Sequence, residues 1–150
     1  MSVNYQPSQY HSVTPYILLA DVQGLIDFLG AAFNAEVVEK IATPDGTIMH
    51  AEVKIGDSII MMGQPSPEFE LSKSLIYVYT EDVNATYKQA LEAGGTSMEE
   101  PKDQFYGDRI AAVKDPFGKL WWIATHIEDV SSEELDKRSK EEFEKRAQES

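Results

Sequence analysis

The chain has 150 residues, of which 42% are hydrophobic and 10% aromatic, and its formal net charge is −13. This size and composition predict one domain, residues 1–150, with its own core, and the negative charge disfavours nucleic acids and anionic membranes as partners. The absence of cysteine excludes disulfides, thiolate metal sites and cysteine nucleophiles. With no signal-peptide pattern and no apolar run of the roughly 18 residues that span a bilayer, we expect a cytoplasmic protein.

The first predicted module covers about residues 12–63 and reads strand, helix and three strands. After the initial strand, a helix is expected from about Asp21 to Phe33, because apolar residues recur there at the spacings of one buried stripe. Asp21 can cap the start of this helix, and Asn34 can take the left-handed conformation that ends it. The following strands are predicted near residues 36–41, 48–55 and 58–62.

The same order returns in a second module of about residues 74–126. Asp82 repeats Asp21 at an offset of 61 and begins a helix that we expect to end near Ala93, before two glycines. The strands after it are predicted near residues 96–100, 109–114 and 119–125.

Two further segments lie outside the repeat. The proline-containing stretch of about residues 64–73 is interpreted as the linker between the modules. Mixed charges at helical spacing predict a mostly solvated C-terminal helix over about residues 131–147.

The strands that precede the two helices separate an aliphatic face from a tyrosine-rich face. Side chains two residues apart share a face of a strand, so Ile17 and Leu19 should pack under the first helix while Tyr16 lies on the opposite face. In the second module, Tyr77 and Tyr79 take that opposite face. We expect the tyrosine-rich faces to line a cavity.

Parts of the second module are similar to motifs of a known superfamily. Val113-Lys114-Asp115-Pro116-Phe117-Gly118-Lys119 resembles the Asp-Pro-x-Gly hairpin of the vicinal oxygen chelate superfamily, the glyoxalase, bleomycin-resistance and extradiol dioxygenase group. Tyr106-Gly107-Asp108-Arg109, with Trp121 and Ala124-Thr125-His126, resembles the PhnB-like branch. The resemblance covers about residues 12–126 and implies an α+β fold in which two tandem βαβββ modules form a cup-shaped mixed sheet.

The resemblance also implies where a metal would be held. Metal-dependent relatives have histidine and glutamate ligands on the first and last strands of each module. The corresponding positions here are Thr14, Met61, Leu75 and Trp122, none of which offers an imidazole, carboxylate or thiolate. We therefore expect no metal and no other cofactor. Phosphate loops, nucleophile elbows and HExxH patterns are also absent from the sequence, so phosphoryl transfer, serine hydrolysis and zincin chemistry have no support.

The cup is expected to bind a small molecule that is partly aromatic or apolar. The predicted ligand-binding residues combine apolar surface with a few polar tips: Tyr16, His50, Met61, Tyr77, Tyr79, Tyr106, Arg109 and Trp122. The aromatic members and Met61 could instead be ordinary core. Arg109 could hold an anion or pair with one of the many acidic residues.

His50 and Glu52 are the candidates for catalysis. They lie two residues apart on a predicted strand, opposite apolar neighbours, so both could face the cup. His50 can be a hydrogen-bonding pocket residue, a structural histidine or a metal ligand. The pair keeps open an alternative function, a metal-dependent or acid–base lyase, isomerase or dioxygenase of the same superfamily.

The last expectations concern partners. Open sheet edges invite unwanted pairing unless they are covered, and two-fold dimers are the commonest soluble oligomers, so we expect a homodimer. A third possible function is a partner-binding protein that uses the acidic C-terminal helix.

Overall fold

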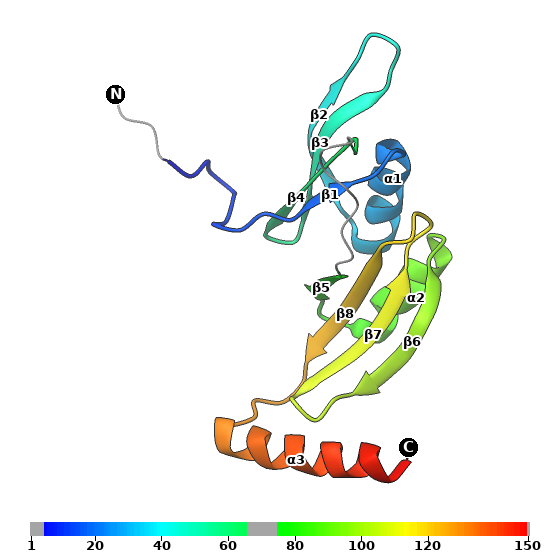
Figure 1. The fold of residues 1–150 in the computed structure, drawn as a ribbon. Helices are drawn as coiled ribbons and strands as arrows, with labels where there is room; N and C mark the ends of the chain where they lie inside the picture. The colour runs from blue at the N-terminus through cyan, green and yellow to red at the C-terminus, as the bar shows by residue number, and fades with distance from the viewer. Residues whose placement is uncertain (1–4, 66–74, 150) are drawn as a thin grey trace.

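A computed structural model describes residues 5–65 and 75–149 of the chain, so from residue 66 onward the predicted linker lies outside the described residues. The first module contains strand β1 (Tyr16–Leu18), helix α1 (Val22–Phe33) and strands β2 (Glu36–Ala42), β3 (Ile48–Ile55) and β4 (Ser58–Gly63). The second contains strand β5 (Leu75–Tyr79), helix α2 (Val83–Glu92) and strands β6 (Thr96–Asp103), β7 (Asp108–Lys114) and β8 (Leu120–His126). Helix α3 (Ser132–Glu149) follows, and Figure 1 shows the whole arrangement.

The strands form two four-stranded sheets, one in each module, ordered β1-β4-β3-β2 and β5-β8-β7-β6. The strand before each helix, β1 or β5, pairs in parallel with the last strand of its module, β4 or β8. The remaining pairs are antiparallel. The predicted α+β fold with a repeated βαβββ order is therefore confirmed. Within the described residues no ladder joins the two sheets, and the modules meet through α1 and α2 (Figure 1).

The predicted helix ends are formed by the residues that the sequence indicates. The Asp21 carboxylate accepts a hydrogen bond of 2.9 Å from the backbone N–H of Gly24, and Asp82 accepts one of 3.2 Å from Ala85. Asn34 ends α1 in the left-handed conformation, with φ 57° and ψ 34°. Each helix is thus fixed locally before it packs on its sheet.

The aliphatic sides of both sheets pack against the helices in one continuous core. Trp121 of β8 is fully buried in it, and its ring centroid lies 5.4 Å from that of Phe33 at the end of α1. Because Phe33 belongs to the first module and Trp121 to the second, this contact joins the two halves of the core.

The Asp-Pro-Phe-Gly hairpin between β7 and β8 is built around a buried carboxylate. Asp115 is only 3% exposed and accepts hydrogen bonds of 2.9 Å from the backbone N–H groups of Phe117 and Lys119 and from the indole N–H of Trp121. The Phe117 ring reaches α1 at Gly24, where an added Cβ would stand 2.5 Å from the ring. The hairpin therefore holds the second module against the first.

Helix α3 lies across the far end of the second module (Figure 1) and has no buried residue. The Arg138 guanidinium anchors it by donating to the carbonyl oxygen of Phe105 at 3.1 Å and to the carboxylates of Glu128 and Glu134. This agrees with the predicted solvated helix. No helix in the described part of the chain is long and apolar enough to cross a membrane.

Replacing Trp121 by alanine should lower the free energy of unfolding by about 3–5 kcal/mol, because the change empties a fully buried site and removes one donor from Asp115. The matched control is Trp122→Ala, since Trp122 lies on the other face of β8 and is only half-buried. Urea denaturation followed by circular dichroism measures both losses. Equal losses would show that the two indoles are not divided between a core face and an open face.

Candidate functional site

The first candidate group lies on the face of the first sheet opposite α1. Tyr16 pairs with Met61 across β1 and β4, and Glu52 pairs with Met61 across β3 and β4. Paired residues point to the same side of a sheet, so these three share a face, and His50 joins them from two positions before Glu52. This is the face expected from the alternation in the sequence.

A chain of hydrogen bonds links the polar members of this group. The Tyr10 hydroxyl donates to one carboxylate oxygen of Glu52, and the other oxygen lies 2.8 Å from Nε2 of His50. Nδ1 of His50 lies 3.0 Å from the Tyr16 hydroxyl. Glu52 is only 5% exposed, and a buried carboxylate without such partners would be strongly destabilising. Glu52 therefore holds His50 and Tyr10 directly, and it holds Tyr16 through His50.

A glycine makes room for this chain. A Cβ at Gly63, on β4, would stand 2.7 Å from the Tyr16 hydroxyl oxygen and 2.9 Å from the carbonyl oxygen of Met49. Any larger side chain would displace Tyr16 from His50. The absence of a side chain at this position is thus part of the site.

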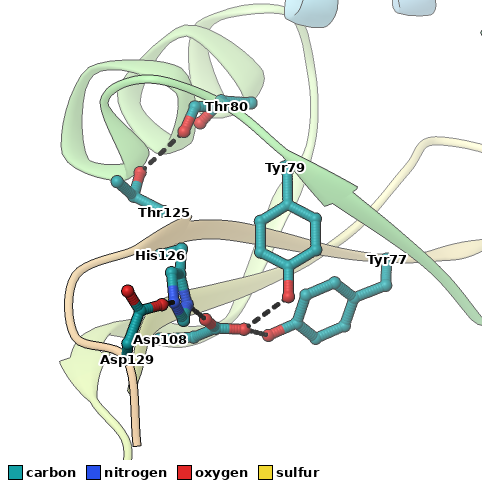
Figure 2. A network of polar contacts seen from close by, with 7 residues as sticks. All are labelled: Tyr77, Tyr79, Thr80, Asp108, Thr125, His126 and Asp129. Atoms are coloured by element: carbon teal, nitrogen blue, oxygen red, sulfur yellow. Dashed lines mark hydrogen bonds and ion pairs between the residues drawn. The ribbon is translucent and has the colours of Figure 1, made fainter.

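The second group lies on the corresponding face of the second sheet, where Tyr77 pairs with Trp122 and Asp108 pairs with His126. The hydroxyls of Tyr77 and Tyr79 donate to the same oxygen of Asp108, at 2.6 and 2.9 Å. Nδ1 of His126 lies 2.8 Å from the other oxygen, as Figure 2 shows. Asp108 is 3% exposed, so it is a second buried carboxylate with a full set of partners.

This group continues toward the C-terminal helix. Nε2 of His126 lies 2.7 Å from Asp129, which belongs to the segment between β8 and α3 (Figure 2). On the other face of β8, the Thr125 hydroxyl donates to the Thr80 carbonyl and accepts from the N–H of Val83, at 2.9 and 2.8 Å. These bonds tie β8 to the start of α2 and so hold His126 in place.

The contacts shift the pKa values of the second group. Burial acts to raise the pKa of Asp108, but hydrogen bonds from two phenols and an imidazole outweigh it and hold that pKa below its ordinary value. Burial, followed by the bond to Asp108, raises the pKa of Tyr77 well above its usual range. Bonds to Asp108 and Asp129 raise the pKa of His126. The arrangement favours a charged carboxylate, neutral phenols and a protonated imidazole.

The structure divides the predicted ligand-binding residues between the two faces. Tyr16, His50 and Met61 belong to the first group, whereas Tyr77, Tyr79 and Trp122 belong to the second. Ring centroids lie 5.6 Å apart for Tyr16 and His50, 5.3 Å for Tyr77 and Tyr79, and 6.1 Å for Tyr77 and Trp122. Tyr106 also contacts the second group, since its hydrogen bond contributes to the raised pKa of Tyr77.

Arg109 lies apart from the other predicted site residues. Its Nε donates to Asn84 of α2 at 3.1 Å, and one terminal nitrogen forms an ion pair of 2.9 Å with Asp103. It shares the helix-facing side of β7 with Ala111 and Val113, which belong to the core. The structure thus places Arg109 with an acidic neighbour, the alternative that the sequence left open.

Sequence reasoning missed four members of these networks, Tyr10, Asp108, His126 and Asp129. Alternation along β7 could have identified Asp108, because placing Ala111 and Val113 in the core assigns Asp108 to the opposite face. No signal could have identified Tyr10, which precedes the first strand and lies in a segment without helix or strand.

A groove of about 690 Å³ runs between the modules. Its walls come from the segment before β1, the end of α1, the β3–β4 hairpin and β5 with the turn that follows. Of the predicted ligand-binding residues, only Tyr77 and Tyr79 line it. The inter-module groove and the two aromatic faces are therefore separate surfaces that meet at β5.

The side chains at the four expected metal positions do not fit a metal ion. Met61 and Trp122 present a thioether and an indole, and Thr14 and Leu75 add no imidazole or carboxylate. Across residues 5–65 and 75–149, no three histidine, aspartate or glutamate side chains are arranged to hold a metal ion.

The fold and this pair of faces define a class of protein. The sequence profile of the Glyoxalase/Bleomycin resistance protein/Dioxygenase superfamily matches residues 11–123, and the chain belongs to that superfamily. It is also 30% identical over 146 residues to the uncharacterized protein Mb0911c of Mycobacterium bovis, covering 90% of this chain and 93% of that protein. The protein Rv0887c of Mycobacterium tuberculosis is likewise 30% identical, with 84% of its length covered.

Solved structures have the same fold. TioX from Micromonospora sp. ML1 superimposes with a TM-score of 0.68 at 22% identity, covering 78% of this chain and 99% of that one. A superfamily member from Sphaerobacter thermophilus gives a TM-score of 0.64 at 20% identity, covering 77% and 96%. At these identities the likeness establishes the fold alone.

The pKa of His126 should lie above the ordinary value of 6.5, and Asp108→Asn should lower it more than Asp129→Asn, because the bond to Asp108 is the larger cause. The stabilisation from this raised pKa is present below pH 6.5 and is lost as the pH rises through the folded-state pKa. Titration of the histidine ring protons by nuclear magnetic resonance measures the shift, with His126→Gln identifying the resonance. An unshifted His126 in the parent protein would contradict the pairing.

Proposed function

We propose that the protein binds a small, partly aromatic or apolar molecule on the tyrosine-rich faces of its sheets, without a metal ion. The observation that carries this proposal is the exposure of large aromatic side chains beside buried carboxylates. Tyr16 is 50% exposed and Tyr79 62% exposed, yet each belongs to a hydrogen-bonded network around a carboxylate that is at most 5% exposed. Rigidly held aromatic surface with a few polar tips is the usual lining of a small-molecule site.

The proposal includes a homodimer that completes the site. In one chain, α1 packs against α2, while the two aromatic faces lie on separate sheets. A second copy could cover these faces and enclose a ligand between them, which would bury the exposed aromatic surface. The ligand cup would then require two chains.

The finer features of the proposal come from the sequence. The segment Tyr106-Gly107-Asp108-Arg109 supports a place in the PhnB-like branch of the superfamily. The absence of cysteine suits a cytoplasmic location, and the net charge of −13 disfavours nucleic acids and anionic membranes as partners.

An acid–base enzyme is the alternative, because each face holds a carboxylate–histidine pair at 2.8 Å, Glu52 with His50 and Asp108 with His126. Such pairs can move a proton in catalysis. Product formation from a bound molecule would favour this function, and one tightly bound metal ion per chain by elemental analysis would favour a metal-dependent enzyme.

A partner-binding function would use helix α3, on which Phe143 is 76% exposed. Truncation at Ile127 separates this function from the others. It should remove partner binding but leave small-molecule binding by the first sheet intact, whereas the second sheet also loses Asp129, the partner of His126.

Small aromatic molecules should bind to the chelator-treated protein, and Trp122→Ala should weaken this binding by about tenfold or more, because the indole would lose its stacking contact with the ligand. Binding is measured by the change in ligand signals in nuclear magnetic resonance. Tyr87→Ala serves as the control, since Tyr87 belongs to α2 and donates to Ser97 away from both faces. An equal loss in both variants, or binding only after metal is restored, would contradict the proposal.

The chain should have twice the mass of 16.8 kDa in solution. Light scattering at micromolar concentration measures it for the full-length chain and for a chain that ends at Ile127. A dimer in both would place the interface on the sheets, whereas a monomeric full-length chain would overturn the dimer and the shared cup.

A further inference from the structure

The segment before β1 lies along the first sheet, although residues 5–15 contain no helix or strand. Its contacts with β3 and the β3–β4 turn are few and exposed. Lys54 donates to the side chain of Gln9 at 3.3 Å, and Nε2 of His11 lies 2.9 Å from the carbonyl oxygen of Asp57. The segment is also held at its end, where the Pro15 carbonyl accepts a hydrogen bond of 2.9 Å from the N–H of Met61. Exposed polar contacts contribute little to stability, so the part around Gln9 and His11 can leave the sheet at low cost while Pro15 stays paired with β4.

Tyr10, between these two contacts, is the exception. It is half-buried, and its hydroxyl donates to the buried carboxylate of Glu52. Tyr10 is one of the residues that line a groove of about 490 Å³ over the tyrosine-rich face of the first sheet. Sheet residues Glu52 and Met61 form part of that groove, while the segment itself forms most of the rest. A phenol that belongs to the chain thus occupies the open face of the candidate site.

The carboxylate of Glu52 sets a condition on anything that replaces this phenol. One of its oxygens is held by His50, at 2.8 Å, and the other depends on Tyr10. A molecule without a hydrogen-bond donor would leave that second oxygen buried and unpaired, which opposes binding. An anionic molecule would be repelled by the carboxylate. A neutral ring with a hydroxyl meets both conditions.

We propose that the face of the first sheet around Glu52 and Met61 binds a phenol-type ligand, an aromatic ring with a hydroxyl group, and that the ligand's hydroxyl takes the place of Tyr10 on Glu52. This inference rests on the proposed small-molecule function and names the ligand class for the first face. Tyr10 is then an internal competitor, and the affinity for the ligand is reduced by the fraction of molecules in which Tyr10 is bound.

The probe is p-cresol, the side-chain analogue of tyrosine, and the matched control ligand is toluene, which lacks only the hydroxyl. Dissociation constants are measured by nuclear magnetic resonance titration of the full-length chain. Tyr10→Ala should bind p-cresol about tenfold more tightly than the parent protein, because the competitor is removed. Toluene should bind this variant more weakly than p-cresol.

Three further variants keep the test decisive. Tyr10→Phe retains the ring and loses only the bond to Glu52, so its affinity for p-cresol should lie between those of the parent and Tyr10→Ala. Tyr87→Phe removes a hydroxyl that donates to Ser97 at 2.6 Å, elsewhere in the fold, and should leave p-cresol affinity unchanged. Adding Glu52→Gln to Tyr10→Ala should abolish most of the preference for p-cresol over toluene.

Equal affinities of Tyr10→Ala for p-cresol and toluene would overturn the proposal, because the hydroxyl would then play no part. Unchanged p-cresol affinity in both Tyr10 variants would overturn it too, since Tyr10 would be a fixed part of the fold. If other aromatic molecules still bind in a way that depends on Trp122, only the phenol class fails. If no aromatic molecule binds the parent protein or the variants, the proposed function fails as well.

Discussion

The burial of Asp115 is the constraint on which the arrangement of the two modules depends. A carboxylate that is 3% exposed must be fully hydrogen-bonded, and two backbone N–H groups of its own hairpin together with the Trp121 indole satisfy it. Its partners therefore fix both the turn and the orientation of the indole. Trp121 then packs on Phe33, and the hairpin's Phe117 packs at Gly24, so one buried carboxyl group positions the second module against α1.

The other two buried carboxylates, Glu52 and Asp108, are satisfied differently. Both lie on strands, and their hydrogen-bond partners in the described part of the chain are phenol and imidazole side chains. Backbone donors cannot be exchanged without unfolding the turn, whereas a side chain can move away and leave its place to a ligand or a water molecule. Asp115 therefore stabilises the fold, whereas Glu52 and Asp108 place polar groups on an open surface.

The sequence predicted the elements because their signals are local. Asp21, Asp82 and Asn34 mark helix ends through bonds within a few residues, and alternation along a strand correctly placed Ile17 and Leu19 in the core and Tyr16 on the opposite face. Residue contacts between distant segments leave no such signal. The ion pair of Arg109 and the separation of the aromatic residues into two groups depend on how sheets and turns come together.

Hydrogen bonds between side chains organise this surface. In a metal site, a cation neutralises the carboxylates and fixes the histidines. Here hydrogen-bond donors fulfil both tasks: phenols and an imidazole surround Asp108, and the pKa of His126 is raised so that its charge complements the carboxylate. The second face is therefore organised, and close to electrically balanced, by its own side chains. For the proposed ligand, binding energy can come from aromatic contact, and selectivity can come from the donors that the carboxylates require.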